Sequence, residues 1–119
     1  MAATDEMTRA SFETLYERFN ARDIEAVLAR LTSDVDWPNG WEGGYVHGHD
    51  EVRAYWTRQW SEIDGTVIPE DFSTEADGRI DVTVHQVVKN LEGELLEDTT
   101  VHHVYRLRGD QIEHMEIRK

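Results

Sequence analysis

The sequence predicts an α+β fold in which helices come first and an antiparallel sheet follows. Up to about residue 63, apolar residues recur three and four positions apart, the spacing of one face of a helix. After Gly65 they recur at every second position, as in a strand with one buried face. Turn dipeptides separate the later segments at Asp77-Gly78, Glu92-Gly93 and Gly109-Asp110. Helices followed by a strand meander are typical of the α+β class.

Length and composition indicate a single domain, residues 1–119, with a small core. The chain has 119 residues, of which 39% are hydrophobic and 31% charged. Asp and Glu outnumber Lys and Arg by 25 to 12, and the net charge of -13 disfavours nucleic acid and anionic lipid as partners. The absence of cysteine excludes disulfides and thiolate chemistry. There is no long apolar run and no leader-like segment, so we expect a cytoplasmic protein without membrane contact.

Three helices are expected. The first spans about Thr8–Asn20, and the second follows Asp23, whose carboxylate favours a helix N-terminus. The third begins at Asp50 and carries three aromatic side chains on one stripe. The apolar stripes that define the helices are Phe12, Leu15, Tyr16 and Phe19; Ile24, Val27, Leu28 and Leu31; and Val52, Tyr55, Trp56, Trp60 and Ile63.

The other segments have the patterns of strands and loops. Val35 and Trp37 alternate with acidic residues, which predicts a short strand that ends at Pro38-Asn39-Gly40. We expect a glycine-rich loop to carry His47 and His49, and residues 1–6 to be a frayed start. Four further strands are expected, the first at a sheet edge because it contains proline. They are Val67–Ala76, Arg79–Lys89, Leu95–Arg108 and Gln111–Ile117.

A register follows if Glu92-Gly93 is a tight turn, because position i then pairs near position 185 minus i. The more apolar set of partners faces inward and includes two polar residues, Gln86 and His103. The adjacent histidines, His85 and His102, then face outward. The inward set is Ile80, Val82, Val84, Gln86 and Val88 with Val101, His103, Tyr105 and Leu107. An apolar face with a few polar groups is typical of a small-molecule site.

The outer face of the expected sheet also carries apolar residues. Val87 and Val104 would be exposed there in a monomer. We therefore expect a homodimer that forms through the outer sheet face.

The order of these elements resembles the nuclear transport factor 2-like superfamily, particularly its SnoaL-like and ketosteroid isomerase-like branches. The resemblance covers nearly the whole chain. It implies a cystatin-like cone, in which a curved antiparallel sheet wraps around the N-terminal helices and encloses a pocket. It also implies dimers through the outer sheet face. The segments that carry it are Asp23–Leu28, Leu31–Trp37, Val46–Val52 and Val104–Ile112.

The resemblance argues against steroid isomerisation in particular. The catalytic Asp of ketosteroid isomerases would correspond to Asn39, which cannot take a proton from carbon. Their first-helix Tyr would fall near Leu15, with Tyr16 adjacent, and their protonated Asp would fall on His103. The superfamily contains isomerases, dehydratases, cyclases and binding proteins, so the fold does not decide the function.

His103 is the strongest candidate for acid–base catalysis, because an imidazole titrates near neutral pH and burial shifts it readily. The alternative is a core histidine held by a neighbour. Asn39 is the second catalytic candidate, as a hydrogen-bond donor to a carbonyl, although a turn residue after Pro38 explains it equally well. Gln86 would orient His103 or a ligand, or be a buried amide.

Aromatic side chains are the expected lining of the pocket, with plain core packing as the alternative, most strongly for Trp56. Trp41 is the best placed to close the pocket mouth, because it lies in a glycine-rich loop. The remaining ligand-binding candidates are Tyr16, Trp37, Trp60, Tyr105 and Met115. We expect no metal site, because His47 and His49 lack a third ligand and His102 and His103 point to opposite faces.

The expected function is binding of a small apolar molecule, with no cofactor. A catalytic version would be a cofactor-independent isomerase, dehydratase or cyclase that acts by proton transfer on an apolar cyclic substrate. His103 would move the proton and Asn39 would polarise the substrate. The alternative is a non-catalytic ligand-binding or dimeric interaction module.

Overall fold

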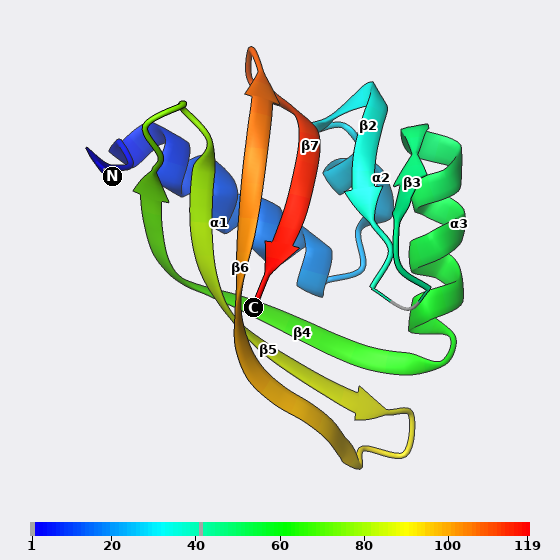
Figure 1. Cartoon of the computed structure of the whole chain (residues 1–119). Helices are drawn as coiled ribbons and strands as arrows, with labels where there is room; N and C mark the ends of the chain where they lie inside the picture. Colours follow the sequence, from blue (N-terminus) through cyan, green and yellow to red (C-terminus); the bar gives the residue numbers. More distant parts are fainter. Residues whose placement is uncertain (1, 41) are drawn as a thin grey trace.

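The computed structural model describes residues 2–40 and 42–119 and confirms the α+β class. The helices occupy the first half of the chain together with strands of two to eight residues, and strands of eight to fourteen residues fill the second half (Figure 1). The helices are α1 (Glu6–Asn20), α2 (Ile24–Leu28) and α3 (Gly48–Trp60). The strands are β1 (Ala2–Ala3), β2 (Leu31–Pro38), β3 (Tyr45–His47), β4 (Ile63–Thr74), β5 (Ile80–Asn90), β6 (Leu95–Arg108) and β7 (Gln111–Arg118).

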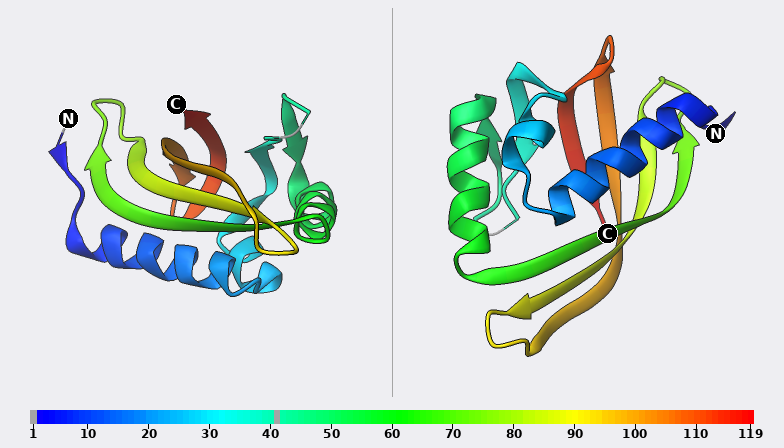
Figure 2. Two further views of the ribbon diagram at one scale, coloured as in Figure 1. Left: turned by 90° about the horizontal axis from the view of Figure 1, so that it is seen from below. Right: turned by 180° about the vertical axis from the view of Figure 1, so that it is seen from behind.

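These strands form one curved sheet in the order β1-β4-β5-β6-β7-β2-β3. The meander from β4 to β7 is antiparallel, as expected, whereas β2 pairs with β7 in parallel. Figure 2 shows α1 lying along one face of the bent sheet and α3 at the end of the sheet where β2 and β3 lie. The result is the expected cone, with its helices on the concave side.

The helix boundaries differ from the expected ones for local reasons. Helix α1 begins two residues early because the Asp5 carboxylate caps it by accepting a hydrogen bond from the Thr8 amide at 3.0 Å. Helix α2 ends at Leu28, since Leu31 already belongs to β2. Helix α3 begins at Gly48, where φ is +75° and a Cβ atom would lie 3.2 Å from the Ser33 carbonyl oxygen.

Two expectations about loops are therefore wrong. His47 ends strand β3 and His49 lies in the first turn of α3, so these histidines are not in a glycine-rich loop. The start of the chain is also not simply frayed. Ala2 and Ala3 pair with the end of β4 and cover part of its outer edge.

Strand β4 starts at Ile63, four residues earlier than expected. Among the residues described, it pairs on its outer side only with Ala2 and Ala3, at Ser73 and Thr74, so most of it is the edge strand that its proline indicated. Pro69 lies at a shift in the register with β5. Further along this edge, the Asn20 side chain takes the place of a neighbouring strand. Its amide nitrogen donates to the Val67 carbonyl at 2.8 Å, and its oxygen accepts from the Val67 amide at 3.0 Å. This pair ties the end of α1 to the sheet.

The predicted register between β5 and β6 is confirmed from Ile80, which pairs with Tyr105, to Val88, which pairs with Glu97. The turn itself is longer than assumed: Asn90 bonds to Glu94 across it, and Gly93 adopts a φ of +90°. A bulge between Val88 and Lys89 then shifts the pairing by one residue. The one-residue shift from the longer turn and the one-residue shift at the bulge cancel each other. The residues of β5 and β6 that face inward and outward are therefore the predicted ones.

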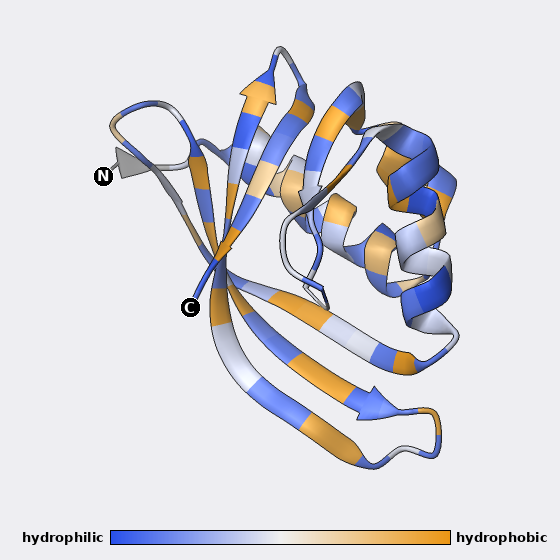
Figure 3. Ribbon diagram, turned by 45° about the vertical axis from the view of Figure 1, so that its right-hand side comes forward, coloured by the Kyte–Doolittle hydropathy of each residue, from blue (hydrophilic) through white to orange (hydrophobic). Residues whose placement is uncertain are grey.

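Figure 3 shows the resulting alternation of apolar and polar residues along β5 and β6. The inner face packs against α1, α2 and α3 to form the core, which includes Phe12, Leu28 and Trp56. One expectation for the outer face is wrong: Val104 is completely buried within the single chain. It therefore gives no reason for a dimer.

Candidate functional site

A cavity of about 110 Å³ lies inside the cone, and all three helices and five of the strands contribute to its lining. Most of the lining is apolar or aromatic. The residues around it are Leu15, Tyr16, Phe19, Val27, Trp37, Pro38, Tyr55, Trp56, Gln59, Trp60, Ile63, Gly65, Val67, Gln86, Val88, His103, Tyr105, Met115 and Ile117. Among the residues that the structure describes, those around this cavity include no Asp, Glu, Lys or Arg.

The tryptophans Trp37, Trp56 and Trp60 form one wall of the cavity. Trp56 is buried and contacts Trp37 edge to face, with ring centroids 5.2 Å apart. Trp60 lies beside Trp56 and contacts Phe19 of α1. These rings pack against one another and also border the cavity. Trp41, expected at the mouth, lies outside the described residues.

Three polar side chains meet at the inner end of the cavity. The Tyr16 hydroxyl, from α1, lies 2.8 Å from Nδ1 of His103 and 2.8 Å from the Tyr105 hydroxyl, both on β6. His103 and Tyr105 face inward because they are two residues apart on the same strand. The structure thus brings together three of the predicted site residues, which we call the Tyr16–His103–Tyr105 cluster.

Burial controls the ionisation of this cluster. It lowers the pKa of His103 from 6.5 to about 4, and the neighbouring His102 contributes in the same direction. It also raises the pKa of both Tyr16 and Tyr105, since a buried phenolate is costly. At neutral pH the cluster therefore consists of a neutral imidazole and two neutral phenols.

The neutral cluster offers a ligand one imidazole nitrogen. Nδ1 of His103 is hydrogen-bonded to the Tyr16 hydroxyl. Nε2 has no hydrogen-bond partner among the described residues, and it retains some accessible surface. If Tyr16 donates to Nδ1, the proton of the neutral ring is on Nε2, which then donates to a ligand. If Nδ1 donates to Tyr16, Nε2 is an acceptor.

Two other predicted residues line the cavity, Gln86 on β5 and Met115 on β7. The Gln86 amide nitrogen donates to the Glu97 carboxylate at 3.2 Å, so Gln86 does not hold His103. Sequence reasoning missed Gln59, which faces the cavity from α3. It lies three residues after Trp56 on the same helical stripe, and this spacing would have identified it.

The structure does not bring Asn39 to the cavity. Asn39 follows β2, and its side-chain oxygen accepts from the Glu42 amide at 3.0 Å. Its backbone closes the same turn through Gly43 and Gly44. This is the turn role that was the alternative for Asn39.

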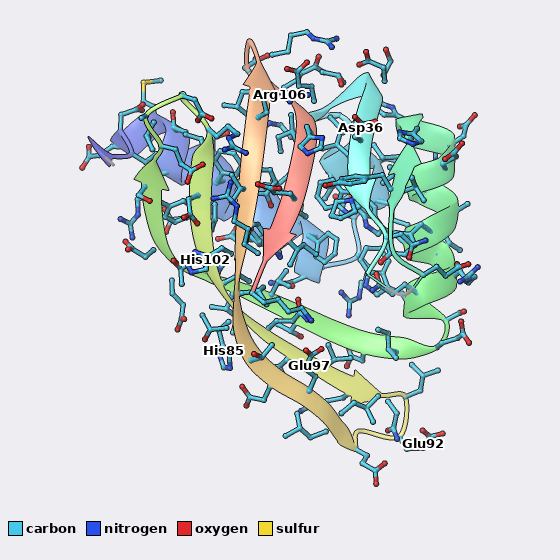
Figure 4. All side chains as sticks on the ribbon, in the orientation of Figure 1. Asp36, His85, Glu92, Glu97, His102 and Arg106 are labelled. Atoms are coloured by element: carbon cyan, nitrogen blue, oxygen red, sulfur yellow. The ribbon has the colours of Figure 1, made fainter. Side chains whose placement is uncertain are left out.

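The histidines outside the cavity contact other groups: His47 and His114 both approach Asp36, and His49 lies 2.9 Å from the Leu31 carbonyl oxygen. His47 contacts Asp36 at 2.5 Å, His85 contacts Asp98 at 2.6 Å, and His102 contacts Asp81 at 2.8 Å (Figure 4). Residues 2–40 and 42–119 contain no group of three or more His, Asp or Glu side chains placed to hold a metal ion. None of the helices described is long and apolar enough to cross a membrane.

The sequence matches the SnoaL-like domain family over residues 12–115, which include every part of the cavity except Ile117. The chain belongs to the SnoaL-like family. This confirms the resemblance found in its sequence.

Solved structures similar to this SnoaL-like chain share the whole cone. An NTF2-like protein of unknown function from Burkholderia pseudomallei is 28% identical, with a TM-score of 0.80 over 93% of this chain and 88% of that one. TerC co-crystallised with polyporic acid is 24% identical, with a TM-score of 0.78 over 92% and 88% of the two chains. A putative polyketide cyclase from Xanthomonas campestris is 19% identical, with a TM-score of 0.74 over 92% and 87%. The curated proteins give no significant match.

Proposed function

We propose that this SnoaL-like protein binds a small, mostly apolar organic molecule that has a ring system and one or two polar substituents. The observation that carries the proposal is an aromatic, uncharged cavity with its polar groups gathered at defined points. Such cavities bind through apolar contact area and use a few hydrogen bonds for orientation. A cavity of about 110 Å³ is comparable to the ~150 Å³ apolar cavity that holds benzene, so one ring fits its enclosed part.

The Tyr16–His103–Tyr105 cluster is the proposed anchor for the polar substituent. A carbonyl or hydroxyl oxygen of the ligand accepts from Nε2 of His103 when Tyr16 donates to Nδ1. The co-crystallisation of TerC with polyporic acid and the naming of other neighbours as putative polyketide cyclases support a ring-containing ligand.

A thermal-shift screen with terpenoid, polyketide and aromatic compounds tests this proposal, because a ligand that binds the folded state raises the melting temperature. His103→Asn is expected to weaken the shift given by a compound with a carbonyl or hydroxyl group. His102→Asn is the matched control, since His102 faces Asp81 on the outer side of the same strand. A shift that is equal in both variants would remove the cluster from the binding site.

A second candidate function is cofactor-independent proton transfer, as in isomerisation, dehydration or cyclisation. It is favoured by one arrangement: Nε2 of His103 has no hydrogen-bond partner among the described residues, while Nδ1 is linked through the Tyr16 hydroxyl to the Tyr105 hydroxyl. With Nδ1 donating to Tyr16, the Nε2 lone pair takes a proton from a carbon next to a carbonyl and returns it at another atom. A base with a pKa of about 4 is suited only to an unusually acidic carbon.

Deuterium exchange separates the two functions. A compound that binds is incubated with the protein in D₂O, and its mass is followed with time. Catalysis predicts incorporation of deuterium that is lost in His103→Asn and kept in His102→Asn. Binding without incorporation would leave the protein a ligand-binding module.

We also propose that two copies associate through the outer sheet face. Support comes from Ile68 and Leu95, which are 46% and 56% exposed. Ile68 pairs with His85 and Leu95 pairs with Lys89, so both lie on the outward side of the sheet. These two residues replace Val104 as the apolar surface that a dimer would cover.

A further inference from the structure

A second polar point of the cavity lies on the long arm formed by β5 and β6. Gln86 faces the cavity and donates its amide nitrogen to Glu97, which is half-buried on the neighbouring strand. An ionised carboxylate only accepts hydrogen bonds, so the nitrogen must be the end of the amide that faces Glu97. The Gln86 amide oxygen is left without a partner among the residues described. Glu97 thereby fixes Gln86 as a hydrogen-bond acceptor.

The two polar points are separated along the strand. Val82 pairs with His103, and Gln86 lies four residues further on the same inner face. At about 3.3 Å per residue, this places the two levels roughly 13 Å apart along β5. Apolar lining residues surround the Gln86 level: Val67 pairs with Gln86, and Val88 and Ile63 lie further toward the tip of the arm. A ligand that touches both points is therefore elongated.

The charges around the cavity discriminate against anions. Of the residues described, those that line it include no Lys or Arg to balance a ligand carboxylate. At the Gln86 end, the Glu97 carboxylate contacts the lining directly. The Arg22 guanidinium lies over the Trp60 ring at 4.7 Å but is paired with Asp64 at 2.7 Å, and the chain as a whole carries -13. An anion would lose its hydration and meet a like charge.

We infer that the ligand of the proposed function is electrically neutral, with a hydrogen-bond acceptor at its inner end and a hydrogen-bond donor at its outer end. The donor is recognised by the Gln86 amide oxygen, which Glu97 holds in place. This inference rests on the proposed function and adds the polarity and charge of the ligand. Gln86 is the specificity-determining residue, and Glu97 is a positioning residue that acts through it.

Three probes with one skeleton test the inference: chalcone, 4-hydroxychalcone and 4-carboxychalcone. Each has the same carbonyl and rings, and they differ only in having no donor, a phenol donor or a carboxylate at one end. Binding is measured by quenching of tryptophan fluorescence, since Trp37, Trp56 and Trp60 line the cavity. We expect 4-hydroxychalcone to bind roughly three- to tenfold more tightly than chalcone, the value of about one hydrogen bond. We expect 4-carboxychalcone to bind at least about tenfold more weakly than chalcone.

Variants assign the discrimination to named residues. Gln86→Leu, or Gln86→Met as a second apolar form, is expected to make chalcone and 4-hydroxychalcone bind equally. Glu97→Gln is expected to strengthen binding of 4-carboxychalcone. Glu92→Gln is the matched control, because it removes the same charge at the tip of the same arm, away from the Gln86 amide (Figure 4). It is expected to leave the order of the three probes unchanged.

The outcomes separate the two proposals. If chalcone and 4-hydroxychalcone bind the unaltered protein equally, or if 4-carboxychalcone binds best, the inference is overturned while the proposed binding function stands. The inference is also overturned if the preference for the phenol survives in both Gln86 variants. If none of the three probes binds, the proposed function and the inference fall together.

Discussion

The Tyr16 hydroxyl lies 2.8 Å from Nδ1 of His103, although the two residues are 87 positions apart in the chain. This contact joins the middle of α1 to the inner face of β6. Tyr16 is also bonded to Tyr105, so a single hydroxyl satisfies two buried polar groups of the sheet. The same contact that stabilises the packing of α1 therefore couples the tautomer of the imidazole in the cavity to the direction in which the Tyr16 hydroxyl donates.

Tyr16→Phe is expected to destabilise the fold by about 1–3 kcal/mol. It removes one oxygen and leaves both Nδ1 of His103 and the Tyr105 hydroxyl without a partner in a buried setting. Tyr105→Phe is the matched control, and its effect should be smaller because the bond between Tyr16 and His103 survives. Urea unfolding of the three proteins measures the difference. An equal effect of the two substitutions would show that Tyr16 is not the centre of the cluster.

Stability should fall as the pH drops below about 6.5. The pKa of His103 is lowered to about 4 in the folded protein, so between these values the unfolded chain takes up a proton that the folded chain excludes. The stability is thus fully present above the unfolded pKa and decreases toward the folded one. A shift of this size corresponds to roughly 3 kcal/mol once the pH is at or below 4.

Comparison with His103→Asn isolates this contribution from other titrating groups. One of these is His85, whose pKa is raised by its hydrogen bond to Asp98 and whose contribution has the opposite sign. Between pH 7.5 and pH 5, the unaltered protein should lose about 2 kcal/mol that the variant does not lose. Parallel pH profiles of the two proteins would mean that His103 is not shielded from water.

The alternation of residues predicted much of the fold because it reports directly on burial. The period of two placed His103 and Gln86 inward and His85 and His102 outward, and the pairing of β5 with β6 agrees. The pairing of β2 with β7 could not be found this way. This pairing joins strands that are far apart in the sequence, and the residue pattern of neither strand identifies the strand with which it pairs.

The site was predictable where it lies on regular elements and unpredictable elsewhere. Tyr16 and Gln59 lie on the apolar faces that helical spacing identifies, although a glutamine such as Gln59 is also common on exposed helix faces. The assignment of Asn39 failed because a turn residue and a pocket residue have the same local sequence. Val104 is buried although exposure is expected, since a strand pattern shows which face a side chain takes and not how neighbouring side chains cover it.

Asn20→Asp is expected to destabilise the fold by about 1–3 kcal/mol. The substitution keeps the size of the side chain and an acceptor for the Val67 amide, but it turns a carboxylate oxygen toward the Val67 carbonyl in place of a donor. Asn90→Asp is the control, because there the side-chain oxygen accepts from the amides of Glu92 and Glu94 in an exposed turn, and the side-chain nitrogen contacts only the exposed Glu94 carboxylate, at 3.2 Å. Thermal unfolding compares them, and an Asn20→Asp protein as stable as the control would contradict a clamp at β4.

The proposed association through the outer sheet face predicts a sedimenting species of twice the 13.8 kDa chain mass at tens of micromolar protein. Ile68→Glu should convert this species to monomer, because Ile68 is 46% exposed on the outward side and an interface would bury the new charge. Met7→Glu is the matched control: Met7 is even more exposed, at 85%, but lies on α1, on the side of the sheet opposite to the proposed interface. A monomer in the unaltered protein, or loss of the dimer in Met7→Glu instead, would place the association elsewhere or remove it.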